Sequence, residues 1–292
     1  MRVCECEDVR AQRDPEKNRK IVVRKSLIVN IMRRFTVILL LLSSLAFVPR
    51  TVSQAPDTDQ SVMATLWYQK SGELRALCYQ AYNLAEMRVN EYLSHPDSGA
   101  QPAVIFDIDE TLLDNSPSEA LNIIEGKPYT SDRWKAWTDR ASARALPGAV
   151  DFCRFLARND VELIYLSNRP NTEILTIMKN LQDLNFPYAD RNHLYMKAET
   201  SDKESRRNSI EKKYNVILLV GDNLADFDEI FEDRSVNLGF HAVDSLREEF
   251  GKKFIILPNP MYGGWTKPLY GSQKGLSPQE LADLRRGLLR TE

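Results

Sequence analysis

The sequence predicts an α/β protein built on a doubly wound parallel sheet, a Rossmann-type core, with a small, mainly helical cap. Short apolar runs alternate along the chain with helical segments of roughly 10–15 residues, which is the pattern of βαβ units. The runs are apolar at nearly every position, as expected for strands that are covered on both faces. Three of the runs also lead directly into a polar motif.

The expected domain begins with helix. Between residues 61 and 93 apolar side chains recur every three or four positions, most clearly at Leu74, Leu77, Ala81, Leu84 and Met87. One or two amphipathic helices are therefore expected there, ended by turn-forming residues at 95–99. The run 103–106, which follows Pro102, is expected to form a buried parallel strand.

Three further strands are expected, each after a helical stretch. They are 161–166, 216–220 and 254–257, and the helical stretches open at Pro147-Gly148, span 202–214 and lie around 244–250. Residues 54–292 then form a single domain, and its cap elements are expected from about 60–100 and from 112–146.

The N-terminal part differs from the rest in charge. The 292 residues include 39 Lys+Arg and 41 Asp+Glu, a formal net charge of −2. Residues 1–53 carry 11 of the basic and only 5 of the acidic residues, which leaves residues 54–292 at −8. A chain without a basic excess is not expected to bind nucleic acid polymers, because such binding needs cations to neutralise phosphates.

Residues 32–53 have the parts of a signal peptide. Met32-Arg33-Arg34 precedes the apolar run 35–48, and small residues follow it. The run is shorter than the roughly 20 apolar residues of a spanning helix, so no stable membrane span is expected after cleavage. An uncleaved N-terminal anchor is the alternative. Residues 1–31 precede this segment and are interpreted as a misassigned start or a polar extension, with Met32 as the true start.

The cysteines do not suggest a disulfide framework or a zinc site. There are only four, Cys4, Cys6, Cys78 and Cys153, and their spacing matches no zinc motif. Cys78 and Cys153 either pair in an oxidising compartment or remain two buried thiols, and the sequence leaves both open.

Two carboxylates follow the strand expected at 103–106. Asp107 and Asp109 are two apart, so they leave the strand on the same side and face one site. Carboxylates held together repel unless a cation or a proton separates them, and oxygen ligands suit Mg²⁺. The pair therefore predicts a magnesium site where the strand ends.

Polar motifs also follow the next two predicted strands. Ser167-Asn168-Arg169 comes after 161–166, and Gly221-Asp222 begins a segment in which Asp222 and Asp226 are four apart. Lys203 lies between them in sequence. Each motif alone is common, but their order and their positions at strand ends favour one catalytic site, since ligands bind at the carboxyl ends of such strands.

This set of residues resembles the four motifs of the haloacid dehalogenase superfamily. Longer stretches look like class C acid phosphatases, a family that includes lipoprotein e 5′-nucleotidases, and the resemblance covers roughly residues 60–290. The stretches are 106–116, 146–149, 167–169, 221–227 and 262–265. The resemblance implies a phosphomonoesterase with a haloacid dehalogenase-like fold.

The expected mechanism uses two aspartates. Asp107 is assigned as the nucleophile that forms an aspartyl-phosphate, and Asp109 as the general acid and then base. The family implies Mg²⁺ held by the carboxylates of Asp107 and Asp222 and by the backbone carbonyl of Asp109. It further implies that Asp226 orients metal-bound water, and that the phosphoryl group or the rest of the substrate is bound by Ser167, Lys203, Thr111, Asn168 and Arg169.

Aromatic residues suggest the substrate class. Trp134 and Trp137 stand three apart, and Tyr262 opens the loop Tyr262-Gly263-Gly264-Trp265. In the resembling nucleotidases such aromatics stack on the nucleobase, a role carried over here to Trp134 and Tyr262, and simple core packing is the alternative. The leading expectation is hydrolysis of 5′-nucleotides. A phosphatase without nucleotide preference and a non-catalytic surface or storage protein on this fold are the alternatives.

The expected location is outside the cytoplasm. Lipoprotein members carry a cysteine at the cleavage site, but no cysteine lies between Met32 and Leu77. A soluble periplasmic or secreted enzyme is therefore expected rather than an outer-membrane lipoprotein. The physiological substrate, the pH optimum and the oligomeric state are not readable from the sequence.

Overall fold

The computed structural model describes residues 60–95, 99–197, 199–271 and 275–291, all within the compact unit Gln54–Glu292. The predicted polar extension 1–31 and signal peptide 32–53 lie outside the described residues. Among the helices that are described, none combines the length and the apolar character needed to cross a membrane.

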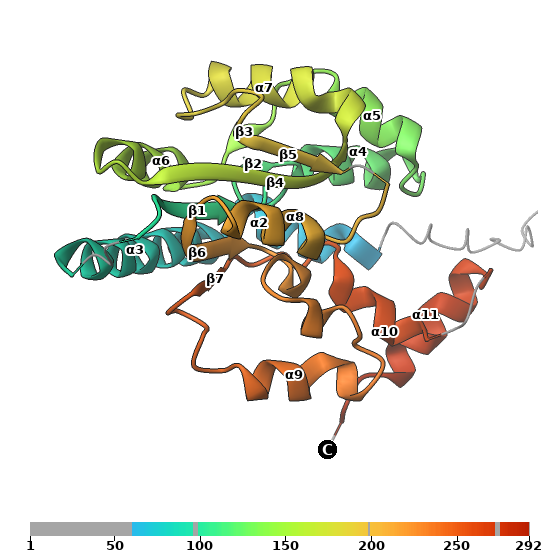
Figure 1. The fold of residues 1–292 in the computed structure, drawn as a ribbon. Coiled ribbons are helices and arrows are strands. Elements are labelled where there is room, and N and C mark those ends of the chain that lie inside the picture. The colour runs from blue at the N-terminus through green and yellow to red at the C-terminus, as the bar shows by residue number, and fades with distance from the viewer. Residues whose placement is uncertain (1–59, 96–98, 198, 272–274, 292) are drawn as a thin grey trace, which may run out of the picture. The chain divides into compact units, whose positions relative to one another are not determined.

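A parallel sheet forms the centre of the unit (Figure 1). It is ordered β5-β4-β1-β6-β7, and every neighbouring pair is parallel. The strands are β1 (Pro102–Phe106), β4 (Glu162–Pro170), β5 (Leu194–Lys197), β6 (Asn215–Gly221) and β7 (Phe254–Ile256). The predicted doubly wound sheet is therefore confirmed, and β5 is the strand that the sequence did not indicate. The chain turns from one side of β1 to the other between β5 and β6, so β1 is the switch point where such sheets bind ligands.

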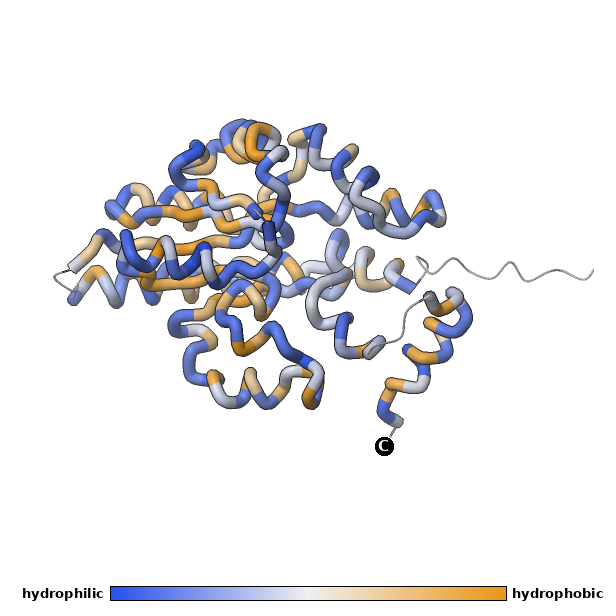
Figure 2. Tube along the Cα trace, turned by 45° about the vertical axis from the view of Figure 1, so that its right-hand side comes forward, coloured by the Kyte–Doolittle hydropathy of each residue, from blue (hydrophilic) through white to orange (hydrophobic). Residues whose placement is uncertain are grey.

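Helices cover both faces of the sheet. On one face α3 (Gly72–Ser94), α6 (Ala149–Arg158) and α7 (Ile174–Asp183) pack with Val104 and Phe106 in one apolar cluster. On the other, α8 (Glu204–Glu211) and α9 (Phe240–Ser245) pack around a cluster that contains the alternate strand residues. Figure 2 shows the resulting pattern, with the most hydrophobic segments in the strands between the helices. Double coverage explains why these strands are apolar throughout.

A small helical layer lies beyond the carboxyl ends of the strands. It consists of α4 (Ser116–Glu125), α5 (Ser131–Thr138) and the two-stranded sheet of β2 (Leu113–Asp114) and β3 (Arg144–Ala145). The helix α2 (Val62–Lys70) contacts α4. Segment 112–146 thus matches the predicted cap. The prediction of a cap over 60–100 is wrong for α3, because that helix buries its apolar side chains against the sheet.

The remaining elements are short turns and two C-terminal helices. The described residues contain α10 (Lys267–Tyr270), α11 (Pro278–Gly287) and the 3-10 turns Asn171–Glu173, Leu224–Asp226, Glu229–Phe231, Asn237–Gly239 and Gly264–Thr266. Cys78 on α3 and Cys153 on α6 are buried free thiols, so of the two alternatives left open the structure has the unpaired one.

Candidate active site

The nucleophile candidate and the third acidic motif lie on adjacent strands. Asp107 directly follows β1, and its amide donates to the carbonyl of Val220 on β6 at 2.9 Å. Asp222 follows β6 in the same way. Parallel pairing therefore brings two residues that are 115 positions apart in sequence to one edge of the sheet, as predicted.

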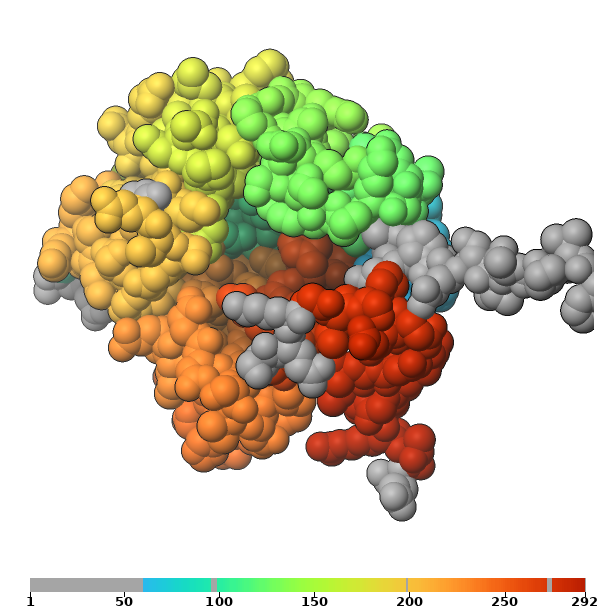
Figure 3. All heavy atoms as spheres, turned by 90° about the vertical axis from the view of Figure 1, so that its right-hand side faces the viewer, coloured from blue at the N-terminus to red at the C-terminus, as the bar shows by residue number. Residues whose placement is uncertain are grey.

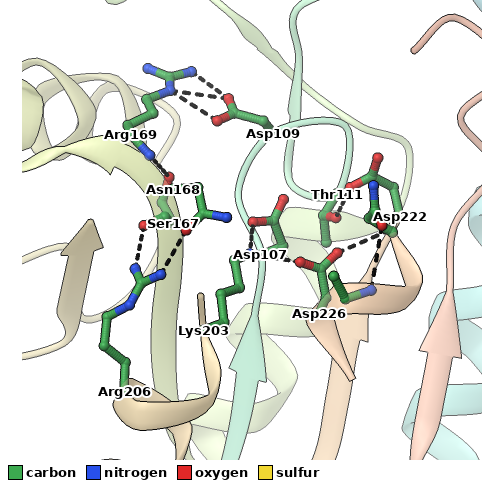
Figure 4. Close-up of polar contacts among 12 residues, drawn as sticks. Asp107, Asp109, Thr111, Ser167, Asn168, Arg169, Lys203, Arg206, Asp222 and Asp226 are labelled. Carbon is green, nitrogen blue, oxygen red and sulfur yellow. Dashed lines mark hydrogen bonds and ion pairs between the residues drawn. The ribbon is translucent and has the colours of Figure 1, made fainter. Parts of the chain in front are cut away.

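Three carboxylates and one lysine form the centre of the site. Asp107, Asp222 and Asp226 each offer a carboxylate oxygen, and these oxygens all lie within 4.8 Å of one another. Lys203, at the N-terminus of α8, is buried and pairs through Nζ with Asp107 and, at 2.7 Å, with Asp226 (Figure 4). The structure thus brings Lys203 to the acidic motifs, although a lysine in a charged helix is usually solvated.

The electrostatics of the cluster fit a divalent cation. Burial raises the pKa of Asp107 to about 7, with Lys203 lowering it and Asp226 raising it again. Burial, then Asp226 and Asp107, raise the pKa of Asp222 well above its ordinary value. Burial alone would lower the pKa of Lys203, but its two carboxylate neighbours raise it. The cluster therefore carries more negative charge than one lysine offsets, and its all-oxygen donor set is of the kind that Mg²⁺ or a similar ion takes.

Asp109 is turned away from this cluster (Figure 4). Its carboxylate accepts from Arg169 Nη2 at 2.6 Å and from Nε at 3.0 and 3.1 Å, and from Asn115 Nδ2 at 2.7 Å. Arg169 is buried, and its guanidinium lies 5.3 Å from the ring centre of Trp134. Arg169, expected to bind substrate, is instead occupied in holding Asp109. Neither Asn115 nor this pairing was predicted from the sequence.

The second motif is braced by an arginine. Arg206 Nη1 donates to the carbonyl of Ser167 at 2.8 Å, and Nη2 donates to Asn168 Oδ1 at 2.6 Å. Figure 4 shows the amide nitrogen of Asn168 turned toward Asp107. Ser167 is fully buried, and its hydroxyl accepts from the amide of Arg169 at 3.0 Å. Sequence analysis missed Arg206, although its position three residues after Lys203, on the same helical face, was a usable signal.

Two cavities meet at the site. The first, about 570 Å³ and here called the phosphate cavity, is lined by Asp107, Asp222, Asp226 and Lys203. The second, about 760 Å³ and here called the aromatic cavity, is lined by Tyr129, Trp134 and Glu173 among others. Asp109, Asn168 and Tyr262 line both. Figure 3 shows this face hollowed between the green segment that contains α4 and α5 and the red C-terminal segment.

Comparison with known proteins agrees with this geometry. Residues 46–265 match the model of the HAD superfamily, subfamily IIIB (acid phosphatase). The chain belongs to this family. It is also similar to the crystal structure of a class C acid phosphatase from Bacillus anthracis with tungstate bound, with 36% identity and a TM-score of 0.76 over 80% of this chain and 98% of that chain. A second structure of the Bacillus anthracis class C acid phosphatase gives 36% identity and a TM-score of 0.77 over 81% and 99%. The protein is thus a phosphomonoesterase of the acid phosphatase type.

Two residues of the first motif of this acid phosphatase have supporting positions. Thr111, expected to contact substrate, lines neither cavity. It is fully buried, its hydroxyl donates to Asp222 at 3.4 Å, and its carbonyl accepts from the hydroxyl of Tyr82 at 2.6 Å. Glu110 is also buried and accepts from the Tyr262 hydroxyl and from the amide of Asn115. Thr111 thus supports Asp222, and Glu110 anchors the Tyr262 loop.

Proposed function

We propose that this acid phosphatase hydrolyses 5′-nucleotides with the help of Mg²⁺ and through an aspartyl-phosphate on Asp107. The observation that carries the proposal is the separation of the two aspartates of the first motif. Asp107 lies in the carboxylate cluster beside Lys203, while Asp109 is held apart by Arg169 at the junction of the two cavities. One carboxylate is thereby placed to attack phosphorus and the other to exchange a proton with the leaving group.

The chemistry then takes two steps. In the first, an oxygen of Asp107 bonds to phosphorus, the bond between phosphorus and the leaving oxygen breaks, and that oxygen takes a proton from protonated Asp109. In the second, Asp109 takes a proton from water as the water oxygen attacks phosphorus, the bond to Asp107 breaks, and inorganic phosphate leaves. Lys203 and the amide of Asn168 stabilise the negative phosphoryl oxygens throughout.

The metal would be held by the carboxylates of Asp107 and Asp222 and by the backbone carbonyl of Asp109. Asp226 lies in the same cluster, paired with Lys203 and accepting from the amide of Asn223 at 2.9 Å, so it supports the ligand set from behind. A divalent cation in this position supplies positive charge that lowers the repulsion between the carboxylates and an anionic phosphoryl group.

The aromatic cavity supports a preference for nucleotides. Its volume of about 760 Å³ far exceeds the needs of a phosphoryl group, and Trp134 and Tyr262 belong to its wall. One side of Trp134 is covered by Arg169, and Tyr129 lies 6.4 Å from it, ring centre to ring centre. Flat aromatic surfaces beside the proton donor suit a leaving group that ends in a planar base.

A panel of phosphomonoesters, assayed with and without EDTA, tests the proposal. We expect EDTA to abolish turnover and added Mg²⁺ to restore it, and kcat/KM to be larger for nucleoside 5′-monophosphates than for ethyl phosphate. Equal values for all esters would support a phosphatase without nucleotide preference. Asp107→Asn should abolish turnover without loss of fold by circular dichroism, and substantial turnover by this variant would exclude the nucleophile assignment.

We further propose that the enzyme is exported to the periplasm or beyond the cell. The support is the basic and apolar pattern of residues 32–53. N-terminal sequencing of the enzyme recovered from the extracytoplasmic fraction tests this, and activity that stays in the cytoplasm with an intact Met1 would contradict it.

A further inference from the structure

Glu173 is a buried carboxylate without a partner. The residue is 4% exposed and stands at the N-terminus of α7, where its side chain makes no capping hydrogen bond. Within the part of the chain that the structure describes, Oε2 is shielded from solvent and accepts no hydrogen bond, and the residue forms no ion pair. Buried carboxylates are normally paired or hydrogen-bonded, because an unpaired one costs several kcal/mol. Such a group calls for an explanation by function.

The nearby cations do not supply the missing partner. Arg169 influences Glu173 electrostatically, but its guanidinium donates to Asp109 and Asn115. Lys197 lines the same cavity and, among the described residues, forms no ion pair with Glu173. The N-terminus of α7 offers partial positive charge, yet none of its amides donates to this side chain. The carboxylate is therefore left as a hydrogen-bond acceptor in search of a donor.

Its position identifies the donor. Glu173 belongs to the wall of the aromatic cavity, together with Trp134 and Tyr129. The terminal torsion of a glutamate is soft and roughly two-fold, so either oxygen can turn to the cavity at little cost. A planar ligand stacked in this cavity would meet a charged acceptor at its edge. A carboxylate favours an amino group there and disfavours a carbonyl oxygen, since a carboxylate only accepts hydrogen bonds.

We propose that Glu173 determines which nucleobases the enzyme accepts, by receiving a hydrogen bond from an exocyclic amino group of the base. This inference rests on the proposed preference for nucleotides and sharpens it. Cytosine and adenine carry an amino group where uracil and hypoxanthine carry a carbonyl, and acidic side chains read cytosine in this way elsewhere. Cytidine and adenosine 5′-monophosphates are thus the better substrates of the two matched pairs.

The ratio of kcat/KM within each pair tests the assignment. We expect cytidine over uridine 5′-monophosphate and adenosine over inosine 5′-monophosphate by about tenfold or more, the usual size of one charged base contact. Glu173→Gln keeps the shape but offers a donor as well as an acceptor, so both ratios should fall to near one. Glu119→Gln is the matched control, because Glu119 is a half-buried carboxylate of the same cavity, and it should leave the ratios unchanged.

A binding measurement separates recognition from folding. In the Asp107→Asn background, calorimetry should give the same preference for cytidine over uridine 5′-monophosphate, and Glu173→Gln should remove it. Glu173→Gln and Glu173→Leu should keep or raise the Tm of the ligand-free protein, because each removes an unpaired buried charge. A lower Tm in both would assign Glu173 a structural role and overturn the inference.

The outcomes also distinguish this inference from the proposed function. Nucleotides that outperform ethyl phosphate while both ratios stay near one in the wild-type enzyme would overturn the role of Glu173 alone. Ratios that survive in Glu173→Gln would do the same. Ethyl phosphate turned over as well as every nucleotide would remove the proposed nucleotide preference and this inference with it.

Discussion

Arg206 fixes the orientation of the Asn168 amide. Its Nη2 donates to Asn168 Oδ1 at 2.6 Å, while the amide nitrogen is turned toward Asp107 (Figure 4). Because an amide has one accepting and one donating end, anchoring the oxygen commits the N–H donors to the phosphate cavity. Arg206 also holds the carbonyl of Ser167, so one guanidinium orders the whole second motif.

Loss of Arg206 should therefore weaken the binding of the phosphoryl group. We expect Arg206→Gln to raise KM and the inhibition constants of phosphate and tungstate by about tenfold, the size of one charge-assisted hydrogen bond, with a smaller change in kcat. Arg206→Lys should recover part of the loss, since it restores the charge without the fork. An unchanged inhibition constant in Arg206→Gln would show that Asn168 needs no such anchor.

Arg169 should control proton transfer by Asp109. Its fork and the amide of Asn115 fix the carboxylate, so Arg169→Gln should leave Asp109 in many orientations. Turnover of alkyl phosphates, whose leaving group needs a proton, should fall about 10²-fold. Turnover of 4-nitrophenyl phosphate should fall much less, because nitrophenolate leaves unprotonated. Equal losses on both esters would contradict a role in proton transfer.

The two buried thiols should make stability fall at high pH. Burial raises the pKa of the Cys78 thiol to about 11, and burial also raises that of Cys153. An unfolded cysteine has a pKa of about 8.5, so above that pH the unfolded chain releases protons that the folded chain keeps. These thiols thus favour folding less as the pH rises from about 8.5 toward 11.

Thiol labelling measures the same effect. In a Cys4→Ser, Cys6→Ser variant, native protein at pH 8 should react with Ellman's reagent at least about tenfold more slowly than protein unfolded in urea, which should show two reactive thiols. Fast labelling of the native variant would show that Cys78 or Cys153 is accessible.

The main catalytic residues were predictable because the chain order of the motifs matches the strand order. Asp107 and Asp222 directly follow strands, so recognising the strands was enough to place them together. Asn115, Arg206 and Glu173 were not predictable in this way. Each becomes part of the site through tertiary packing of a loop or helix, and in sequence each resembles an ordinary polar surface residue.

The helix α3 shows the limit of reading a face from large apolar residues. The predicted series includes Leu77 and Met87, which are 38% and 62% exposed, whereas Cys78, Tyr82, Ala85 and Val89 form the buried stripe. Small residues at Cys78 and Ala85 let the helix approach the sheet closely, and Tyr82 reaches the carbonyl of Thr111. The buried face is thus set by closeness of packing and by one hydrogen bond, neither of which hydrophobic spacing records.

Gly221 should be required by the carboxylate cluster, because β6 passes directly against Asp226. A Cβ at Gly221 would lie 2.5 Å from Asp226 Oδ2 and 2.6 Å from its Cβ. The adjacent carbonyl of Gly221 accepts from the amide of Leu257, so the strand cannot easily move aside. Gly221→Ala should therefore displace Asp226 from Lys203 and from the amide of Asn223.

This displacement should weaken metal binding more than it weakens the fold. We expect Gly221→Ala to raise the Kd for Mg²⁺, measured by calorimetry, by about tenfold or more, as for loss of a residue that orients metal ligands, with a parallel loss of turnover. Gly72→Ala is the control, because a Cβ there meets no atom within 4 Å, and it should leave both unchanged. Wild-type metal affinity in Gly221→Ala would show that the cluster tolerates movement of Asp226, and that Asp107 and Asp222 suffice to hold the ion.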